Sequence, residues 1–146
     1  MTYNWFDTDP PGKKKVNLLR DYIDAELVEA TEQMKAMGPA GLAVGTSKTF
    51  RTLARLTGAA PSSAGPYVKR TLTAPGLRQI INFISRMTAS DRADLEGVSS
   101  DRSHQIVAGA LVAEASMRAL GIEKLEICPW ALREGVILRR IDKGLE

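Results

Sequence analysis

The chain has 146 residues, of which 44% are hydrophobic and 25% are charged, so it is long enough to bury one globular core. No apolar run approaches the roughly 20 residues of a membrane span, and residues 1–20 lack the apolar centre of a signal peptide. These features predict a cytoplasmic protein without a membrane segment. The net charge of +3 permits a polyanionic ligand but does not indicate nucleic-acid binding.

Metal and disulfide chemistry are limited by the composition. The chain has one cysteine, Cys128, and one histidine, His104, so neither an internal disulfide nor a Cys/His zinc site can form. Cys128 precedes Pro129 at the end of an apolar run, which favours a small buried thiol, whereas a nucleophilic cysteine would need His104 beside it. We therefore predict that this segment binds no metal.

The first part of the chain predicts a linker followed by a long helix. Residues 1–15 contain Pro10, Pro11 and Gly12 and are interpreted as a linker into a domain of residues 16–144, with residues 145–146 as a candidate vector-derived tail. From Lys15 to Met37, apolar side chains recur at helical spacing and acidic side chains take the other face. This pattern predicts an amphipathic helix whose methionines fill the core and whose acidic face is solvated.

The stretch Gly41–Phe50 predicts a strand that turns into a helix. Leu42–Val44 is a short apolar run typical of a strand covered on both faces, and Gly45 permits a positive φ or a close backbone approach. Hydroxyl residues then cap a helix that opens near Lys48. Because the N–H groups of a helix N-terminus and a lysine attract anions, this turn is a candidate anion site. The P-loop spacing G-x-x-x-x-G-K-[ST] is absent, so a purely structural turn remains the alternative.

Helices dominate the rest of the chain. We expect a helix of about ten residues after the turn, a loop over Ala59–Pro66, and a short strand or extended segment over Tyr67–Leu72. The later elements are a helix opened by Thr73, a shorter helix over Thr88–Leu95, a helix over His104–Leu120, a strand over Leu125–Cys128 and a last helix over Ala131–Ile141. The alternation predicts an α/β fold. Glu114, inside the small-residue helix, is interpreted as an outward-facing surface carboxylate.

Three motifs in a fixed order carry a resemblance to a known family. They are Val44-Gly45-Thr46-Ser47-Lys48-Thr49, then Asp101-Arg102 with Gln105-Ile106-Val107-Ala108-Gly109-Ala110 two residues later, then Trp130-Ala131-Leu132-Arg133-Glu134-Gly135-Val136. Together they resemble the exopolyphosphatase / guanosine pentaphosphate phosphohydrolase (Ppx/GppA phosphatase) family, from about Asp9 to Ile141. The family usually shows Gly-Thr-x-Gly-Thr at the first motif, where this chain has Lys48 in place of the second glycine.

The resemblance implies a fold and a place within it. Members are similar to actin, sugar kinases and chaperone ATPases, with two ribonuclease-H-like domains around a cleft. This chain would be the C-terminal segment of the second actin-like domain: helix-rich, with two core strands, Leu42–Val44 and Leu125–Cys128, and with the first strands of the domain missing. We then expect Leu42–Val44 at an unpaired sheet edge and a helix face of Leu19, Ile23 and Leu27 without its cover, so that the chain associates with a partner.

The resemblance also implies a function. The complete enzyme would hydrolyse the terminal phosphoanhydride of inorganic polyphosphate or guanosine pentaphosphate with Mg²⁺, using catalytic residues upstream of Met1, so this segment would hold no catalytic residue and would be inactive alone. The implied phosphate-binding residues are Gly45, Thr46, Ser47, Lys48 and Thr49, with Lys69, Arg70 and Arg133 as candidate basic contacts. Expected partners are the substrate, the missing N-terminal segment and a second copy in a homodimer. The alternative is a non-catalytic module for nucleotide or polyanion binding, or for dimerisation.

Overall fold

A small mixed sheet lies at the centre of the computed structural model, which describes residues 5–130 and 132–144. Its strands are β1 (Val44–Gly45), β2 (Thr71–Thr73) and β3 (Lys124–Ile127), in the order β1-β3-β2. β1 runs parallel to β3, and β2 runs antiparallel to it. The sheet thus contains one strand more than the two core strands expected, because the segment left open as strand or extended chain pairs with β3 at its end.

The first strand differs from the prediction in length and burial. β1 contains two residues, and Leu42 and Val44 are 64% and 48% exposed, so the expectation of a strand covered on both faces is wrong. The reason is its position, since β1 pairs with β3 alone and forms one edge of the sheet. The expectation that this stretch lies at a sheet edge is confirmed.

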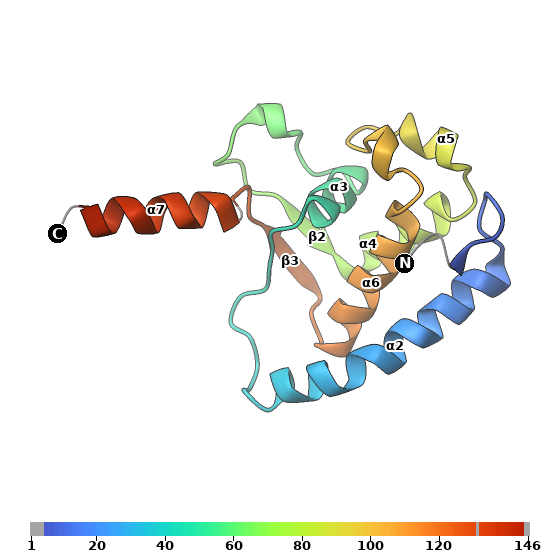
Figure 1. The fold of residues 1–146 in the computed structure, drawn as a ribbon, viewed down its shortest axis with the longest axis horizontal. Helices are drawn as coiled ribbons and strands as arrows, with labels where there is room; N and C mark the ends of the chain where they lie inside the picture. The colour runs from blue at the N-terminus through green and yellow to red at the C-terminus, as the bar shows by residue number, and fades with distance from the viewer. Residues whose placement is uncertain (1–4, 131, 145–146) are drawn as a thin grey trace.

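The long helix α2 (Lys13–Lys35) packs against α6 (Ile106–Ala119), as Figure 1 shows. Leu19 and Ile23 are 0% and 4% exposed, so the expected uncovered face is wrong, because α6 covers it. Buried alanines on α6 let the two helices approach closely. Met34 and Met37 lie at and beyond the end of α2 and are 48% and 80% exposed, so they do not fill the core as expected.

Glu114 corrects a second interpretation, because it is buried rather than outward-facing. Its Oε1 accepts a hydrogen bond from Nε of Arg118 at 3.3 Å, and its Oε2 lies 3.8 Å from Nε of Arg20. Arg118 also donates to both carboxylate oxygens of Asp24 on α2. Spacing on α6 alone could not reveal this, because two of the partners come from another helix. The network joins α2 to α6 by charge as well as by apolar packing.

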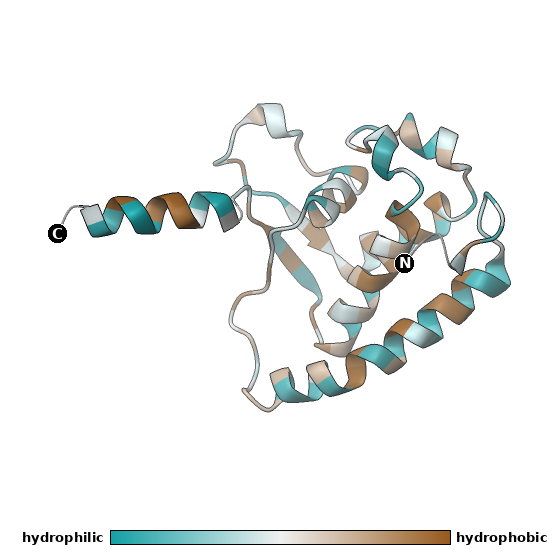
Figure 2. Ribbon diagram, viewed as in Figure 1, coloured by the Kyte–Doolittle hydropathy of each residue, from teal (hydrophilic) through white to brown (hydrophobic). Residues whose placement is uncertain are grey.

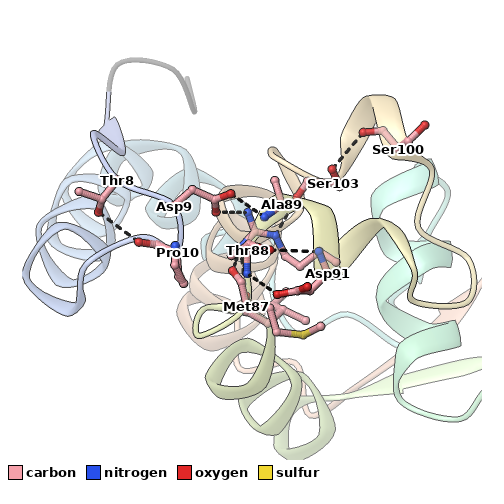
Figure 3. A network of polar contacts seen from close by, with 11 residues as sticks. Thr8, Asp9, Pro10, Met87, Thr88, Ala89, Asp91, Ser100 and Ser103 are labelled. Carbon is pink, nitrogen blue, oxygen red and sulfur yellow. Dashed lines mark hydrogen bonds and ion pairs between the residues drawn. The ribbon is translucent and has the colours of Figure 1, made fainter.

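The segment before α2 contacts the rest of the fold. Trp5 and Phe6 pack against the core, and Oδ2 of Asp9 accepts a 2.7 Å hydrogen bond from the backbone N–H of Ala89 (Figure 3). Ala89 opens the short helix α5 (Ala89–Ala93), whose cap is the reciprocal pair of Thr88 and Asp91. Asp9 therefore attaches this segment to α5.

Arg92 on α5 is the buried centre of that region. It is 3% exposed and donates to three backbone carbonyls, those of Ile84, Met87 and Ser103. Its Nη2 also lies 3.3 Å from Oδ1 of Asp9. Desolvation lowers the pKa of Arg92, and the Asp9 carboxylate opposes that shift. One guanidinium thus holds together the end of α4, the turn before α6 and the N-terminal segment.

The remaining helices follow the predicted order. They are α3 (Lys48–Leu56), α4 (Ala74–Ile84) with Thr73 as its N-cap, and α7 (Leu132–Gly144). Two 3₁₀ turns, η1 (Ser62–Ala64) and η2 (Ser100–Arg102), were not predicted. Figure 1 shows α7 extending away from the body that the other elements form. Among the described residues, no helix is both long enough and apolar enough to span a membrane.

Candidate anion site

The predicted turn between β1 and α3 forms, and Ser47 caps the helix. Its Oγ accepts a 3.2 Å hydrogen bond from the backbone N–H of Phe50, so this hydroxyl serves the helix. Gly45 does not have a positive φ; instead a Cβ at this position would lie 3.0 Å from the Phe50 ring. Of the two reasons considered for a glycine here, the close approach applies.

The other residues of the turn, Thr46, Lys48 and Thr49, have different surroundings. Thr49 packs on α6, where a Cβ added to Gly109 would lie 2.9 Å from its methyl group. Gly109 therefore sets the distance between α3 and α6. Thr46 is exposed at the start of the turn, and the side chain of Lys48 is exposed at the first position of α3. Within the predicted anion site, Lys48 carries the charge that solvent and a ligand can reach.

An open pocket of about 500 Å³ lies beside this turn. Lys48, Arg51 and Arg55 line it from α3, where the spacing i, i+3, i+7 puts them on one helix face. Ile127 and Pro129 line it from the end of β3, and residues of the loop around η1 line it as well. The pocket thus lies beyond the carboxyl ends of the two parallel strands, where α/β sheets usually bind ligands. Arg51 and Arg55 were not predicted, although their spacing from Lys48 was the available signal.

Lys48 is held at the edge of the pocket by the loop before α6. Its Nζ donates to Oγ of Ser99 at 3.2 Å. The pKa of Asp101 is lowered, mainly by a hydrogen bond from Ser99 and further by the charges of Lys48 and Arg102. A carboxylate and a lysine therefore share one hydroxyl residue, which orients the ammonium group.

The two arginines keep part of their donor capacity in the pocket. Arg51 donates to the Pro129 carbonyl at 3.3 Å from an exposed position. Arg55 donates to the Ala59 carbonyl at 2.9 Å and forms an ion pair with Glu96. The Nε of Arg55 is buried and has no hydrogen-bond acceptor within the described residues.

The other candidate basic contacts are placed differently. Arg70 lines the pocket, but its guanidinium donates to four loop carbonyls, those of Ala60, Pro61, Gly65 and Val68, at 2.6–3.0 Å. Lys69 forms an exposed ion pair with Glu126 on β3. Arg133 is exposed on α7, and neither it nor Lys69 lines the pocket. The structure therefore brings Lys48 and Arg70 together, with Arg70 engaged by the loop.

Metal ligands are not gathered in the part of the chain that the structure describes. Nowhere in residues 5–130 and 132–144 do three His, Cys, Asp or Glu side chains lie together as a candidate metal site. Glu96 is the acidic residue that lines the pocket, and Arg55 holds its carboxylate. A single carboxylate that is paired with a cation is a poor Mg²⁺ ligand set for this pocket.

A model of the Ppx/GppA phosphatase family matches residues 1–144 of the sequence. The chain belongs to the Ppx/GppA phosphatase family. It is 70% identical over 142 residues to Exopolyphosphatase 1 of Mycobacterium tuberculosis and 66% identical over 142 residues to that of Mycobacterium leprae. These matches include 97% of this chain but 41% and 42% of the two relatives, so the chain spans about two fifths of their length. It corresponds to a C-terminal segment of them.

Solved structures confirm the fold class. A crystal structure of the Aquifex aeolicus family member superposes with a TM-score of 0.81 at 21% identity, over 99% of this chain and 46% of that one. An exopolyphosphatase from Cytophaga hutchinsonii gives a TM-score of 0.80 at 18% identity, over 97% and 46%. The helix-rich α/β arrangement is therefore part of the actin-like, ribonuclease-H-like fold of this family.

Proposed function

We propose that this chain is the phosphate-contacting segment of an exopolyphosphatase-type hydrolase. In this proposal the chain binds the terminal phosphates of inorganic polyphosphate or guanosine pentaphosphate, in the cytoplasm, and the remaining three fifths of the protein supply the chemistry. The observation that carries it is the face of Lys48, Arg51 and Arg55 on α3, which lines an open pocket next to a helix N-terminus. Membership of a phosphatase family makes a phosphate ester or anhydride the fitting anion.

The geometry of that face favours an extended anion. Lys48 and Arg55 are seven residues apart, which is about 10 Å along a helix axis. A single phosphate group can contact only part of such a row, whereas a chain of linked phosphates can contact several cations at once. Arginine contacts phosphate oxygens with paired donors, and lysine adds a mobile charge. We therefore expect tripolyphosphate to bind more tightly than inorganic phosphate.

Hydrolysis is expected to need residues outside this chain. Cleavage of a phosphoanhydride requires an oriented water, a base and a metal ion that neutralises the developing charge. The pocket lining supplies one carboxylate, which is paired with Arg55, so we place the metal ligands and the base in the segment that precedes this one in the relatives. The purified chain should release phosphate from long-chain polyphosphate only at the background rate. Turnover near the rate of a full-length relative would contradict this proposal.

Anion binding by the chain itself tests the proposed site. Lys48→Ala should weaken pyrophosphate binding by about 1.5–3 kcal/mol, the value of one charge-assisted hydrogen bond, without a change in stability. Isothermal titration measures the affinity, and thermal unfolding checks the fold. Gly45→Val is unsuitable as a binding variant, because its side chain would meet the Phe50 ring and destabilise the turn. Equal affinity in the parent chain and Lys48→Ala would reduce this stretch to a structural turn.

Association through α7 is a second candidate function. Ile137, Leu138 and Ile141 lie on one face of α7 and are 58%, 45% and 53% exposed. Figure 2 shows apolar residues in the middle of α7, the helix that extends from the body in Figure 1. Such a face favours burial against another polypeptide, and for the chain in isolation we propose a second copy. Light scattering should show a concentration-dependent dimer that Ile137→Lys with Ile141→Lys dissociates; a monomer at all concentrations would exclude this role.

A further inference from the structure

The anion pocket contains a built-in negative charge. Glu96 is the acidic residue among those that line it, and its carboxylate pairs with Nη2 of Arg55. That guanidinium edge belongs to the basic face on which the proposed function depends. An incoming phosphate group and the Glu96 carboxylate would therefore use the same donor.

The backbone around Glu96 is fixed, so this pairing is a property of the fold. Gly97 has a φ of +89°, and a Cβ at this position would lie 3.0 Å from Cγ of Arg55. Its carbonyl accepts a 3.0 Å hydrogen bond from Oγ1 of Thr52, which is buried on α3. The close approach and the positive φ both favour glycine at position 97. Glu96 is thus presented to Arg55 by a loop that is attached to the same helix.

The side chain of Glu96, in contrast, is free to leave. It is 71% exposed, and exposed ion pairs contribute little to stability because water and salt screen them. Arg55 also donates to the Ala59 carbonyl, so one of its hydrogen bonds does not involve the carboxylate. The hydrogen bond and charge of Arg55 lower the pKa of Glu96, so the carboxylate is ionised at neutral pH. Because its ion pair with Arg55 is weak and its carboxylate is charged, Glu96 fits a side chain that an anion displaces better than one that stabilises the fold.

We infer that Glu96 is an internal competitor for the anion pocket, whose carboxylate occupies the Arg55 donor that a phosphate group takes when it binds. This inference rests on the proposed function and adds a specificity-determining residue to it. Displacing Glu96 costs the same free energy for any anion that takes the Arg55 donor, so it lowers the affinity of every such anion by the same factor. A linked chain of phosphates that extends over Lys48, Arg51 and Arg55 meets this cost. A single phosphate bound at Lys48 does not displace Glu96, so Glu96 disfavours the anions that extend to Arg55.

The test compares Glu96→Gln with a matched control. Glu32→Gln removes a similarly exposed acid, 67% exposed and paired with Lys35 on α2, far from the pocket lining. Titration of tripolyphosphate and inorganic phosphate at neutral pH and low salt should show tighter binding to Glu96→Gln by up to about 5-fold, the scale of one exposed charge interaction. The gain should be larger for tripolyphosphate, which extends to Arg55, than for inorganic phosphate, which can bind at Lys48 without displacing Glu96. Glu32→Gln should bind both anions like the parent chain.

A double-mutant cycle separates competition at Arg55 from general repulsion. If the Glu96 carboxylate weakens anion binding by occupying the Arg55 guanidinium, Glu96→Gln should improve binding much less in an Arg55→Ala background. An equal gain in both backgrounds, or no gain in Glu96→Gln, would overturn the inference while leaving the pocket intact. If neither the parent chain nor Glu96→Gln binds tripolyphosphate, both the inference and the proposed function fail. Loss of binding in Lys48→Ala with an unchanged Glu96→Gln protein contradicts the inference alone.

Discussion

The arginines of this fold include two kinds that differ in burial and in the number of backbone carbonyls that they contact. Arg92 is 3% exposed, and its donors go to three carbonyls and the Asp9 carboxylate. Arg51 and Arg55 line an open pocket, with one hydrogen bond to a carbonyl each and an exposed carboxylate on Arg55. A buried guanidinium must be fully paired because desolvation is costly, whereas a pocket arginine can keep donors for a ligand. The number of backbone carbonyls bound distinguishes the structural arginine Arg92 from Arg51 and Arg55, which we propose to bind a ligand.

Arg92→Ala should have the largest effect on stability, and it tests whether the buried arginine is structural. It removes a buried guanidinium and leaves buried carbonyls of α4 and the turn before α6 without their donor. We expect a loss of about 3–5 kcal/mol in the free energy of unfolding. Urea titration measures this loss. Arg86→Ala, at a nearby exposed position, should change stability by less than about 0.5 kcal/mol. An Arg92→Ala protein as stable as the Arg86→Ala protein would show that the hydrogen bonds of Arg92 are not structural.

Arg70 should give an intermediate effect, since it lines the pocket yet binds four loop carbonyls. Arg70→Ala is expected to cost about 1–3 kcal/mol of stability and to loosen the loop around η1. Hydrogen exchange of that loop, with urea unfolding, measures both changes. The neighbouring Lys69→Ala removes an exposed ion pair and should cost less than about 1 kcal/mol. If Arg70→Ala leaves the loop protected and instead abolishes anion binding, Arg70 belongs with the ligand-binding group.

Arg51→Ala should have the smallest effect on stability. Its one hydrogen bond to a carbonyl is exposed, so the free energy of unfolding should change by less than about 1 kcal/mol. Its affinity for tripolyphosphate should fall about 10- to 100-fold, the scale of one charge-assisted contact. Titration calorimetry provides the affinity, and Arg133→Ala on α7 serves as the control because Arg133 does not line the pocket. If Arg51→Ala and Arg133→Ala bind tripolyphosphate with similar affinity, Arg51 is not part of the site.

The order of elements followed from local sequence, because periodicity and caps act over a few residues. The helices α2, α3, α4 and α6 form close to where they were predicted, and Ser47, Thr73 and Thr88 cap helices. Burial depends on partners that are distant in sequence. Leu42 and Val44 are exposed because the sheet ends at β1, and Glu114 is buried because α2 brings Arg20 beside it.

The site was predictable in part for the same reason. The turn with Lys48 could be recognised from its glycine and hydroxyl residues, but the pocket depends on the ends of β3 and on the loop around η1. The sequence identifies Arg70 as a basic residue, but it does not reveal the four carbonyls to which Arg70 donates. Arg51 and Arg55 could have been proposed from their spacing on α3. The pairing of Arg55 with Glu96 could not be predicted, because the two residues are 41 positions apart in the sequence.

The central claim, that the basic face of α3 binds linked phosphates, can be tested directly by NMR titration of the parent chain with tripolyphosphate. Backbone amide shifts should change most at the start of α3 and along Lys48, Arg51 and Arg55, with smaller changes at the end of β3, which lines the same pocket. The amide signals of Lys69 and Arg133 should remain where they are. Changes centred on Lys69 or Arg133, or spread evenly over the basic surface residues, would contradict the account.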